Sequence, residues 1–176
     1  MTDRSRSIQA RKNNAKGHMF ENYINAACSY YKRIGQAAIE KIPEPFRTTS
    51  TERNGKFSGR FISNAKPDYI GTLKDGRSIC FEAKYTTTDK MQQSVLTDEQ
   101  WKSLEEHYQM GALVGICIGI KDMFAFIPWE DWKRMKELYG RKYLTEADVE
   151  KYKVPFWNGY CLFLDSFYFK EQVQIL

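Results

Sequence analysis

The stretch PDYIGTLKDGRSICFEAKY, residues 67–85, decides the fold. Two runs rich in β-branched and aromatic residues, Tyr69–Leu73 and Ser78–Tyr85, flank a Lys-Asp-Gly turn, which is typical of a β-hairpin. Residues two apart on a strand point to the same face, so Glu82 and Lys84 project side by side. The hairpin therefore brings a carboxylate and an ammonium group to one spot.

The length of the turn decides whether Asp68 joins this pair. A two-residue loop, Asp75-Gly76, would pair Asp68 with Ala83 and point its side chain to the opposite face. A three-residue loop, Lys74-Asp75-Gly76, would pair Asp68 with Glu82 on the same face. We favour the second geometry, because glycine suits the left-handed bulge position of that loop.

The residues before the hairpin predict a helix, a strand and an excursion from the core. Apolar residues recur at three- and four-residue spacing from Met19 to Ile34, and Gly35 follows as a stop. A short strand at Ala37–Ile42 is closed by two prolines. The segment 46–65 is rich in Ser, Thr, Gly, Asn and Arg, and we interpret it as either a loop or a projecting hairpin.

The residues after the hairpin alternate between helices and strands. Helices are predicted at Asp98–Met110, with Thr97 as N-cap, from Pro128 to before Gly140, and after Thr145. Strands are predicted at Leu113–Ile120, Met123–Ile127, Tyr160–Leu164 and Phe167–Phe169. The whole order is typical of the α/β class, with a mixed β-sheet flanked by helices.

Length and composition indicate one globular domain. The chain of 176 residues is long enough for one hydrophobic core and short for two. It contains no apolar run of membrane-spanning length, and its polar, basic N-terminus has no signal-peptide core, so we expect a cytoplasmic protein. The four cysteines are widely spaced in apolar runs, and we interpret them as reduced core residues.

The positive charge is confined to two segments. Residues 1–16 and residues 47–66 each carry a net charge of +4, whereas the whole chain carries +5. Such clustering is typical of a protein that binds a polyanion. The alternative is a pair of solvated basic loops.

The chemistry of the hairpin points to a hard divalent cation. Two carboxylates a few ångströms apart repel one another unless a cation lies between them. Oxygen ligands without His or Cys select Mg²⁺, or Mn²⁺, over zinc. Lys84 would then orient or help deprotonate an attacking water and stabilise the charge that develops on the transition state. The alternative is ordinary: Asp68 caps a loop, and Glu82 and Lys84 form a solvated cross-strand pair.

These residues carry a resemblance to a known family. The pattern Pro67-Asp68 followed by Glu82-Ala83-Lys84 resembles the motif of the PD-(D/E)XK nucleases, whose core is the restriction-endonuclease-like fold. Over about residues 16–120, the stretches KGHMFENYI, GQAAI, KIPEP, DYIG and FEAKYT resemble RecU-type Holliday-junction resolvases. The resemblance implies a single nuclease domain at 16–176, preceded by a flexible basic tail at 1–15 and interrupted by a stalk-like insertion at about 46–66.

The resemblance also implies roles for individual residues. Asp68 and Glu82 would be metal ligands, and Lys84 would stabilise the transition state. Gln100 would be a further contact to the metal or its water, although Thr97-x-x-Gln100 is also a capping box. Glu21 lies where many nucleases of the superfamily place an extra acidic residue, and the alternative is a solvated helix-face carboxylate.

The insertion at 46–66, hereafter the stalk, is expected to enter the centre of a DNA junction. Its aromatic residues would stack on bases and its basic residues would contact phosphates. The alternative is a loop whose aromatic residues dock on the body of the protein. The family usually carries a hydroxyl residue two positions before Asp68, where this chain has Lys66, which we interpret as a phosphate contact. The predicted DNA contacts are Arg53, Lys56, Phe57, Arg60, Phe61 and Lys66.

The sequence therefore predicts a Mg²⁺-dependent endonuclease that resolves four-way junctions. Two matched nicks in a junction of two-fold symmetry imply a homodimer with one site per subunit. The alternatives are a restriction or repair endonuclease of the same superfamily, and a non-catalytic DNA-binding protein on this fold.

Overall fold

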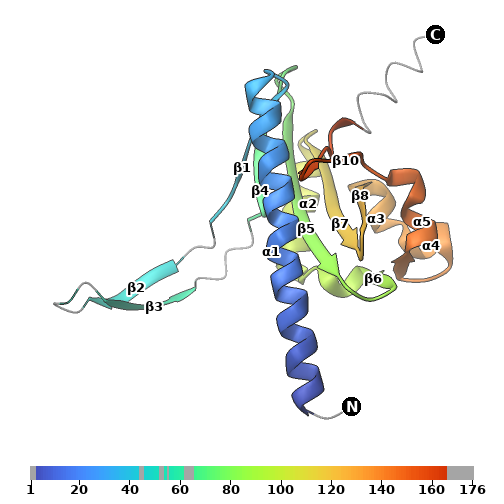
Figure 1. The fold of residues 1–176 in the computed structure, drawn as a ribbon. Coiled ribbons are helices and arrows are strands. Elements are labelled where there is room, and N and C mark those ends of the chain that lie inside the picture. The colour runs from blue at the N-terminus through green and yellow to red at the C-terminus, as the bar shows by residue number, and fades with distance from the viewer. Residues whose placement is uncertain (1–2, 44–45, 52–53, 55, 62–65, 166–176) are drawn as a thin grey trace, which may run out of the picture.

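A five-stranded mixed sheet lies at the centre of the computed structural model, which describes residues 3–43, 46–51, 54, 56–61 and 66–165 (Figure 1). Its strands, in spatial order, are β1 (Ala37–Lys41), β4 (Tyr69–Leu73), β5 (Ser78–Thr86), β7 (Leu113–Ile120) and β8 (Met123–Pro128). β5 and β7 run parallel, whereas the other neighbours are antiparallel. The predicted α/β class, a mixed sheet flanked by helices, is confirmed.

The β4–β5 hairpin has the three-residue turn that the sequence favoured. Tyr69 pairs with Phe81, and the N–H of Leu73 donates to the carbonyl of Arg77 at 2.9 Å, so the loop consists of residues 74–76. Gly76 has a φ of +86°, a conformation that side chains with a Cβ rarely adopt. Continuing this register by one residue places Asp68 opposite Glu82.

Helices cover both faces of the sheet. α1 (Asp3–Arg33) packs on one face, and α2 (Asp98–Gln109) and α3 (Trp129–Lys133) pack on the other. Along β5, Phe81 belongs to the core beneath α1, whereas Cys80 belongs to the core beneath α2 and α3. Because side chains alternate along a strand, even-numbered residues of β5 face α2.

Helix α1 begins earlier than the sequence suggested. Residues 1–15 were expected to form a flexible basic tail, but the helix already starts at Asp3. Residues 3–16 contain neither proline nor glycine, so nothing interrupts the helix that extends back from the buried residues Phe20 and Ile24. The sequence analysis did not predict this part of the helix, because the segment has no apolar periodicity.

The stalk is a hairpin rather than a loop. β2 (Phe46–Thr51) pairs antiparallel with β3 (Phe57–Phe61), with a register shift between Thr48 and Ser50. Figure 1 shows this ribbon extending away from the central sheet on the side of β1. Of the two alternatives left open by the sequence, the structure has the projecting hairpin.

The remaining elements follow β5 and β8. They are β6 (Lys90–Gln92), η1 (Gln93–Val95), α4 (Met135–Tyr139), β9 (Tyr143–Thr145), α5 (Glu146–Val149), η2 (Glu150–Tyr152), β10 (Phe156–Trp157) and β11 (Tyr160–Cys161). The helix predicted from Pro128 is broken into α3 and α4 at Arg134, and the strand predicted at Tyr160–Leu164 ends at Cys161. The strand predicted at Phe167–Phe169 lies outside the described residues.

The cysteines match their predicted role. Cys28, Cys80, Cys117 and Cys161 are all free and buried. Burial raises the pKa of the Cys28 and Cys80 thiols to about 12, which leaves them protonated at neutral pH. In the part of the chain that the structure describes, no helix has the length and apolar character needed to cross a bilayer.

Candidate active site

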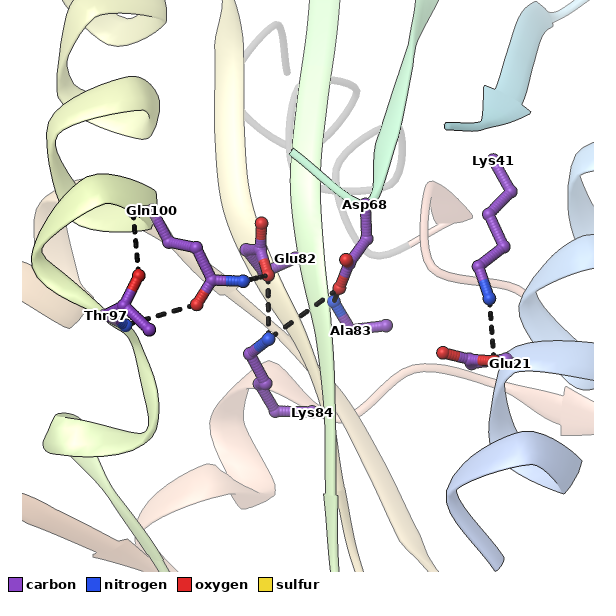
Figure 2. Close-up of polar contacts among 8 residues, drawn as sticks. All are labelled: Glu21, Lys41, Asp68, Glu82, Ala83, Lys84, Thr97 and Gln100. Carbon is purple, nitrogen blue, oxygen red and sulfur yellow. Dashed lines mark hydrogen bonds and ion pairs between the residues drawn. The ribbon is translucent and has the colours of Figure 1, made fainter. Parts of the chain in front are cut away.

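Glu82 is the centre of the polar cluster on the α2 face of β5 (Figure 2). Glu82 is fully buried, with 0% of its surface exposed. One carboxylate oxygen, Oε2, accepts hydrogen bonds from Lys84 Nζ at 2.8 Å and from Gln100 Nε2 at 2.6 Å. The pKa of Glu82 is raised to about 7, chiefly by burial; Lys84 opposes the increase and nearby Asp68 adds to it.

Asp68 lies beside this pair, as the predicted register requires. Its Oδ2 accepts a hydrogen bond from the N–H of Ala83 at 3.0 Å and lies 3.8 Å from Lys84 Nζ. The structure thus brings together Asp68, Glu82 and Lys84, the three residues that the sequence placed at the catalytic centre. Their individual roles stay predictions.

Gln100 joins the cluster from the first turn of α2. The N-cap residue Thr97 accepts from the N–H of Gln100 at 3.2 Å, and the amide oxygen of Gln100 accepts from the N–H of Thr97 at 3.1 Å. The capping box is therefore present. Because a backbone N–H needs an oxygen opposite it, the capping box orients the amide nitrogen of Gln100 toward Glu82. Gln100 thus combines its helical role with a contact to the site.

The two carboxylates fit a hard cation. The other carboxylate oxygen of Glu82, Oε1, is buried without a hydrogen-bond partner among the described residues. A buried carboxylate oxygen is costly to leave unpaired, and a cation would satisfy it. Within the described ranges, no group of three or more His, Cys, Asp or Glu side chains is placed so that it could hold a metal ion. The protein therefore offers two carboxylates, the donor number that Mg²⁺ commonly takes before water and phosphate complete its shell.

Glu21 lies across a neighbouring cleft rather than within the cluster. The cleft, of about 370 Å³, is lined by Glu21, Lys41, Ile42, Pro43 and Asp68. Lys41 Nζ donates to Glu21 Oε2 at 2.7 Å, and His18 Nδ1 lies 3.4 Å from the same oxygen. Asp68 thus borders both the cluster and the cleft. The predicted catalytic role of Glu21 stays a prediction.

Sequence reasoning missed Lys41 and His18. Lys41 ends the edge strand β1, whose register pairs it with Tyr69, next to Asp68. The sequence feature that could have pointed to Lys41 is its position at the end of the predicted strand, just before Pro43. The contact of His18 with Glu21 could have been predicted from their spacing, because residues three apart on a helix are neighbours.

The predicted DNA contacts lie on or beside the stalk. Phe57, Arg60 and Phe61 are residues of β3, and Lys56 and Lys66 are exposed. The hairpin register pairs Arg60 with Arg47. Arg53 lies outside the described residues.

Comparison with known proteins gives a family. The family model described as RecU, Recombination protein U, matches residues 15–169. No curated protein matches the sequence. Among solved structures, Hjc, a Holliday junction resolvase of the archaeal hyperthermophile Archaeoglobus fulgidus, is 12% identical, with 74% of this chain and 88% of that chain covered and a TM-score of 0.45. That likeness is too low to bear on the fold or function of this chain.

Proposed function

Because the chain belongs to the RecU family of recombination proteins, we propose that it resolves four-way DNA junctions as a metal-dependent endonuclease. The observation that carries the metal-dependent chemistry is the cluster of Asp68, Glu82 and Lys84, in which a buried carboxylate oxygen of Glu82 lacks a partner among the described residues. A cation would give this oxygen the partner that the ion pair with Lys84 does not supply.

Asp68 and Glu82 would hold Mg²⁺, or Mn²⁺, between them. The cation, when bound, supplies a Lewis acid that polarises the scissile phosphate and makes the attacking water more acidic. Water attacks phosphorus in line and loses a proton to the solvent, while the bond from phosphorus to the 3′ oxygen breaks and that oxygen takes up a proton from the solvent. The products carry a 5′-phosphate and a 3′-hydroxyl.

Lys84 contributes a fixed positive charge. Its ammonium group contacts Glu82 at 2.8 Å and lies 3.8 Å from Asp68, so it occupies the same face as the two carboxylates. An ammonium group held at that position orients the attacking water and stabilises the negative charge that builds on the phosphate oxygens. Gln100 fixes the carboxylate of Glu82 through its 2.6 Å hydrogen bond.

The stalk and the basic N-terminal part of α1 supply the DNA-binding surface. Residues 1–16 and 47–66 each carry a net charge of +4, and Figure 1 shows that the N-terminal half of α1 and the stalk both extend beyond the sheet. Positive segments that project from the body suit a branched substrate, whose arms diverge from one centre. Symmetric nicking of the junction requires a second subunit, so we propose a homodimer.

The test is cleavage of a synthetic four-way junction and of a linear duplex with the same arm sequences, with Mg²⁺, with Mn²⁺ and with a chelator. We expect paired nicks in the junction that require the cation. Asp68→Asn and Glu82→Gln should abolish nicking but keep junction binding. Glu106→Gln, which removes an exposed carboxylate from the same helix as Gln100, is the matched control and should cut like the wild type.

The alternatives give different outcomes in this assay. Sequence-specific cutting of the duplex would indicate a restriction or repair endonuclease and would overturn the resolvase proposal. Junction binding without any cleavage would indicate a DNA-binding protein that has kept the fold. Cleavage that persists in both carboxylate variants would overturn the assigned site.

A further inference from the structure

A row of alternating cationic and aromatic side chains lies on the small β6–β9 ribbon and the elements beside it. Lys90 Nζ lies 4.8 Å from the ring centre of Tyr143, and the guanidinium carbon of Arg141 lies 4.9 Å from that ring. Arg141 is also 5.8 Å from the ring of Tyr139, and Lys151 Nζ is 5.3 Å from it. We define the cation–aromatic row as Lys90, Tyr143, Arg141, Tyr139 and Lys151.

The charges of the row are only partly compensated. Arg141 forms an ion pair with Asp148 at 2.5 Å. Within the described ranges, neither Lys90 nor Lys151 forms an ion pair within 4 Å, and both residues are exposed; Asp89, which interacts electrostatically with Lys90, is already paired with Lys121. Two lysines therefore stand at the ends of a row whose central arginine is already neutralised, so each end offers a cation to an anionic partner.

The aromatic rings restrict the conformations of the lysine side chains before an anion binds. A lysine over a ring keeps fewer side-chain conformations than a free surface lysine. It therefore loses less conformational entropy when it contacts a phosphate.

The row is tied to the active site by short lengths of chain. Lys90 follows Lys84 by six residues, which span at most about 20 Å. β6 then leads through η1 to Thr97 and Gln100, and β6 pairs with β9 in the register Lys90 to Thr145. Figure 1 shows β6 at the end of β5 that also faces the N-terminal half of α1, away from the β4–β5 turn.

We propose that the cation–aromatic row binds the phosphate backbone of a duplex arm beside the scissile bond. This inference rests on the proposed function, and it adds a contact surface on the side of the active site opposite the stalk. Lys90 and Lys151 make the phosphate contacts, Arg141 is anchored by Asp148, and Tyr143 and Tyr139 hold the cations in place.

The test measures junction binding by fluorescence anisotropy over a range of salt concentrations, without divalent cations so that no cleavage occurs. The Lys90→Ala/Lys151→Ala variant should bind on the order of tenfold more weakly at physiological salt, and the slope of log affinity against log salt should fall by about 1.8, or 0.9 for each lysine that no longer neutralises a phosphate. The Tyr143→Leu variant keeps both lysines, so its affinity should fall while its salt slope stays that of the wild type.

The matched control is Lys32→Ala/Lys74→Ala, which removes two exposed lysines at the other end of the sheet, where the N–H of Lys74 donates to the carbonyl of Gln36. It should bind with the affinity and slope of the wild type. Circular dichroism would check the fold of each variant, and light scattering would check its oligomeric state.

Three outcomes would overturn the inference. If the wild type binds the junction and the Lys90→Ala/Lys151→Ala variant matches it in affinity and slope, the row does not contact DNA and the proposed function stands. If that variant changes its oligomeric state at an unchanged slope, the row contacts another subunit. If the wild type binds no junction, both the proposed function and this inference are wrong.

Discussion

Gln100 donates a hydrogen bond of 2.6 Å to Oε2 of Glu82, so the first turn of α2 holds the carboxylate that β5 presents. Gln100→Leu removes this hydrogen bond to a charged group, whose contribution is typically about 1.5–3 kcal/mol. We expect junction cleavage to slow by about tenfold to a hundredfold, because the carboxylate is no longer fixed. Thr97→Ala removes only the cap and should lower stability by about 1 kcal/mol at unchanged cleavage. Equal loss of cleavage in both variants would contradict a specific role for Gln100.

The burial of Glu82 predicts a pH-dependent stability. Its pKa in the folded chain is raised from 4.5 to about 7, so the folded state binds a proton more tightly than the unfolded state. The contribution of this group is therefore present below pH 4.5 and lost as the pH rises through about 7. Relative to Glu82→Gln, and without divalent cations, the wild type should lose at least about 1 kcal/mol over this window, or about 2–4 °C in Tm.

Thermal unfolding of both proteins between pH 4.5 and 8.5 measures this difference directly. A constant offset between the two melting curves is expected from the altered contact with Lys84 and does not bear on the prediction. A difference in Tm that stays the same at every pH would show that Glu82 titrates near its ordinary value.

The same carboxyl couples metal binding to protons. A protonated Glu82 cannot bind a cation, so protons compete with Mg²⁺ below pH 7. The Mg²⁺ concentration for half-maximal cleavage should rise by up to about tenfold for each pH unit below 7, and should level off above it. Cleavage rates over a Mg²⁺ series at pH 6, 7, 8 and 9 test this. A half-maximal concentration that does not change between pH 6 and 8 would count against Glu82 as a ligand.

The three-residue turn predicts the effect of changing its length. Deleting Gly76 shortens the loop by one residue, and a slip of one residue moves a strand's side chains to the opposite face. Asp68 would then leave the side of the hairpin that carries Glu82. We expect the deletion variant to lose junction cleavage while it still binds the junction.

Gly76→Ala is the control for that deletion, because it keeps the loop length. An alanine at a φ of +86° costs about 1–2 kcal/mol of stability, but the register stays intact. This variant should melt earlier and cut at the wild-type rate. Near-normal cleavage by the deletion variant would show that Asp68 need not face Glu82.

Local sequence chemistry was enough to predict the β4–β5 hairpin. The Lys-Asp-Gly loop closes the strands, and strand alternation then fixes which side chains share a face, so Asp68, Glu82 and Lys84 could be grouped from their spacing along the chain. The predicted fold class is confirmed by the sheet, and the predicted family is confirmed by the family match.

Non-local pairing explains what the sequence did not reveal. β6 and β9 have three residues each and lie about fifty residues apart in the chain, so neither carries a pattern of its own. Lys41 reaches Glu21 only because β1 packs beside α1. The helical start at Asp3 was hidden because the segment is polar, and helix periodicity was sought in apolar residues.

The parallel pairing of β5 with β7 also sets the order in which the site can form. The β4–β5 hairpin is a local structure, but β7 joins β5 only after the intervening residues 87–112, which include α2, have been synthesised and folded back. The burial of Glu82 and its contact with Gln100 therefore depend on residues beyond the hairpin. A nascent chain therefore carries the two carboxylates before it contains the strand and the helix that bury one of them.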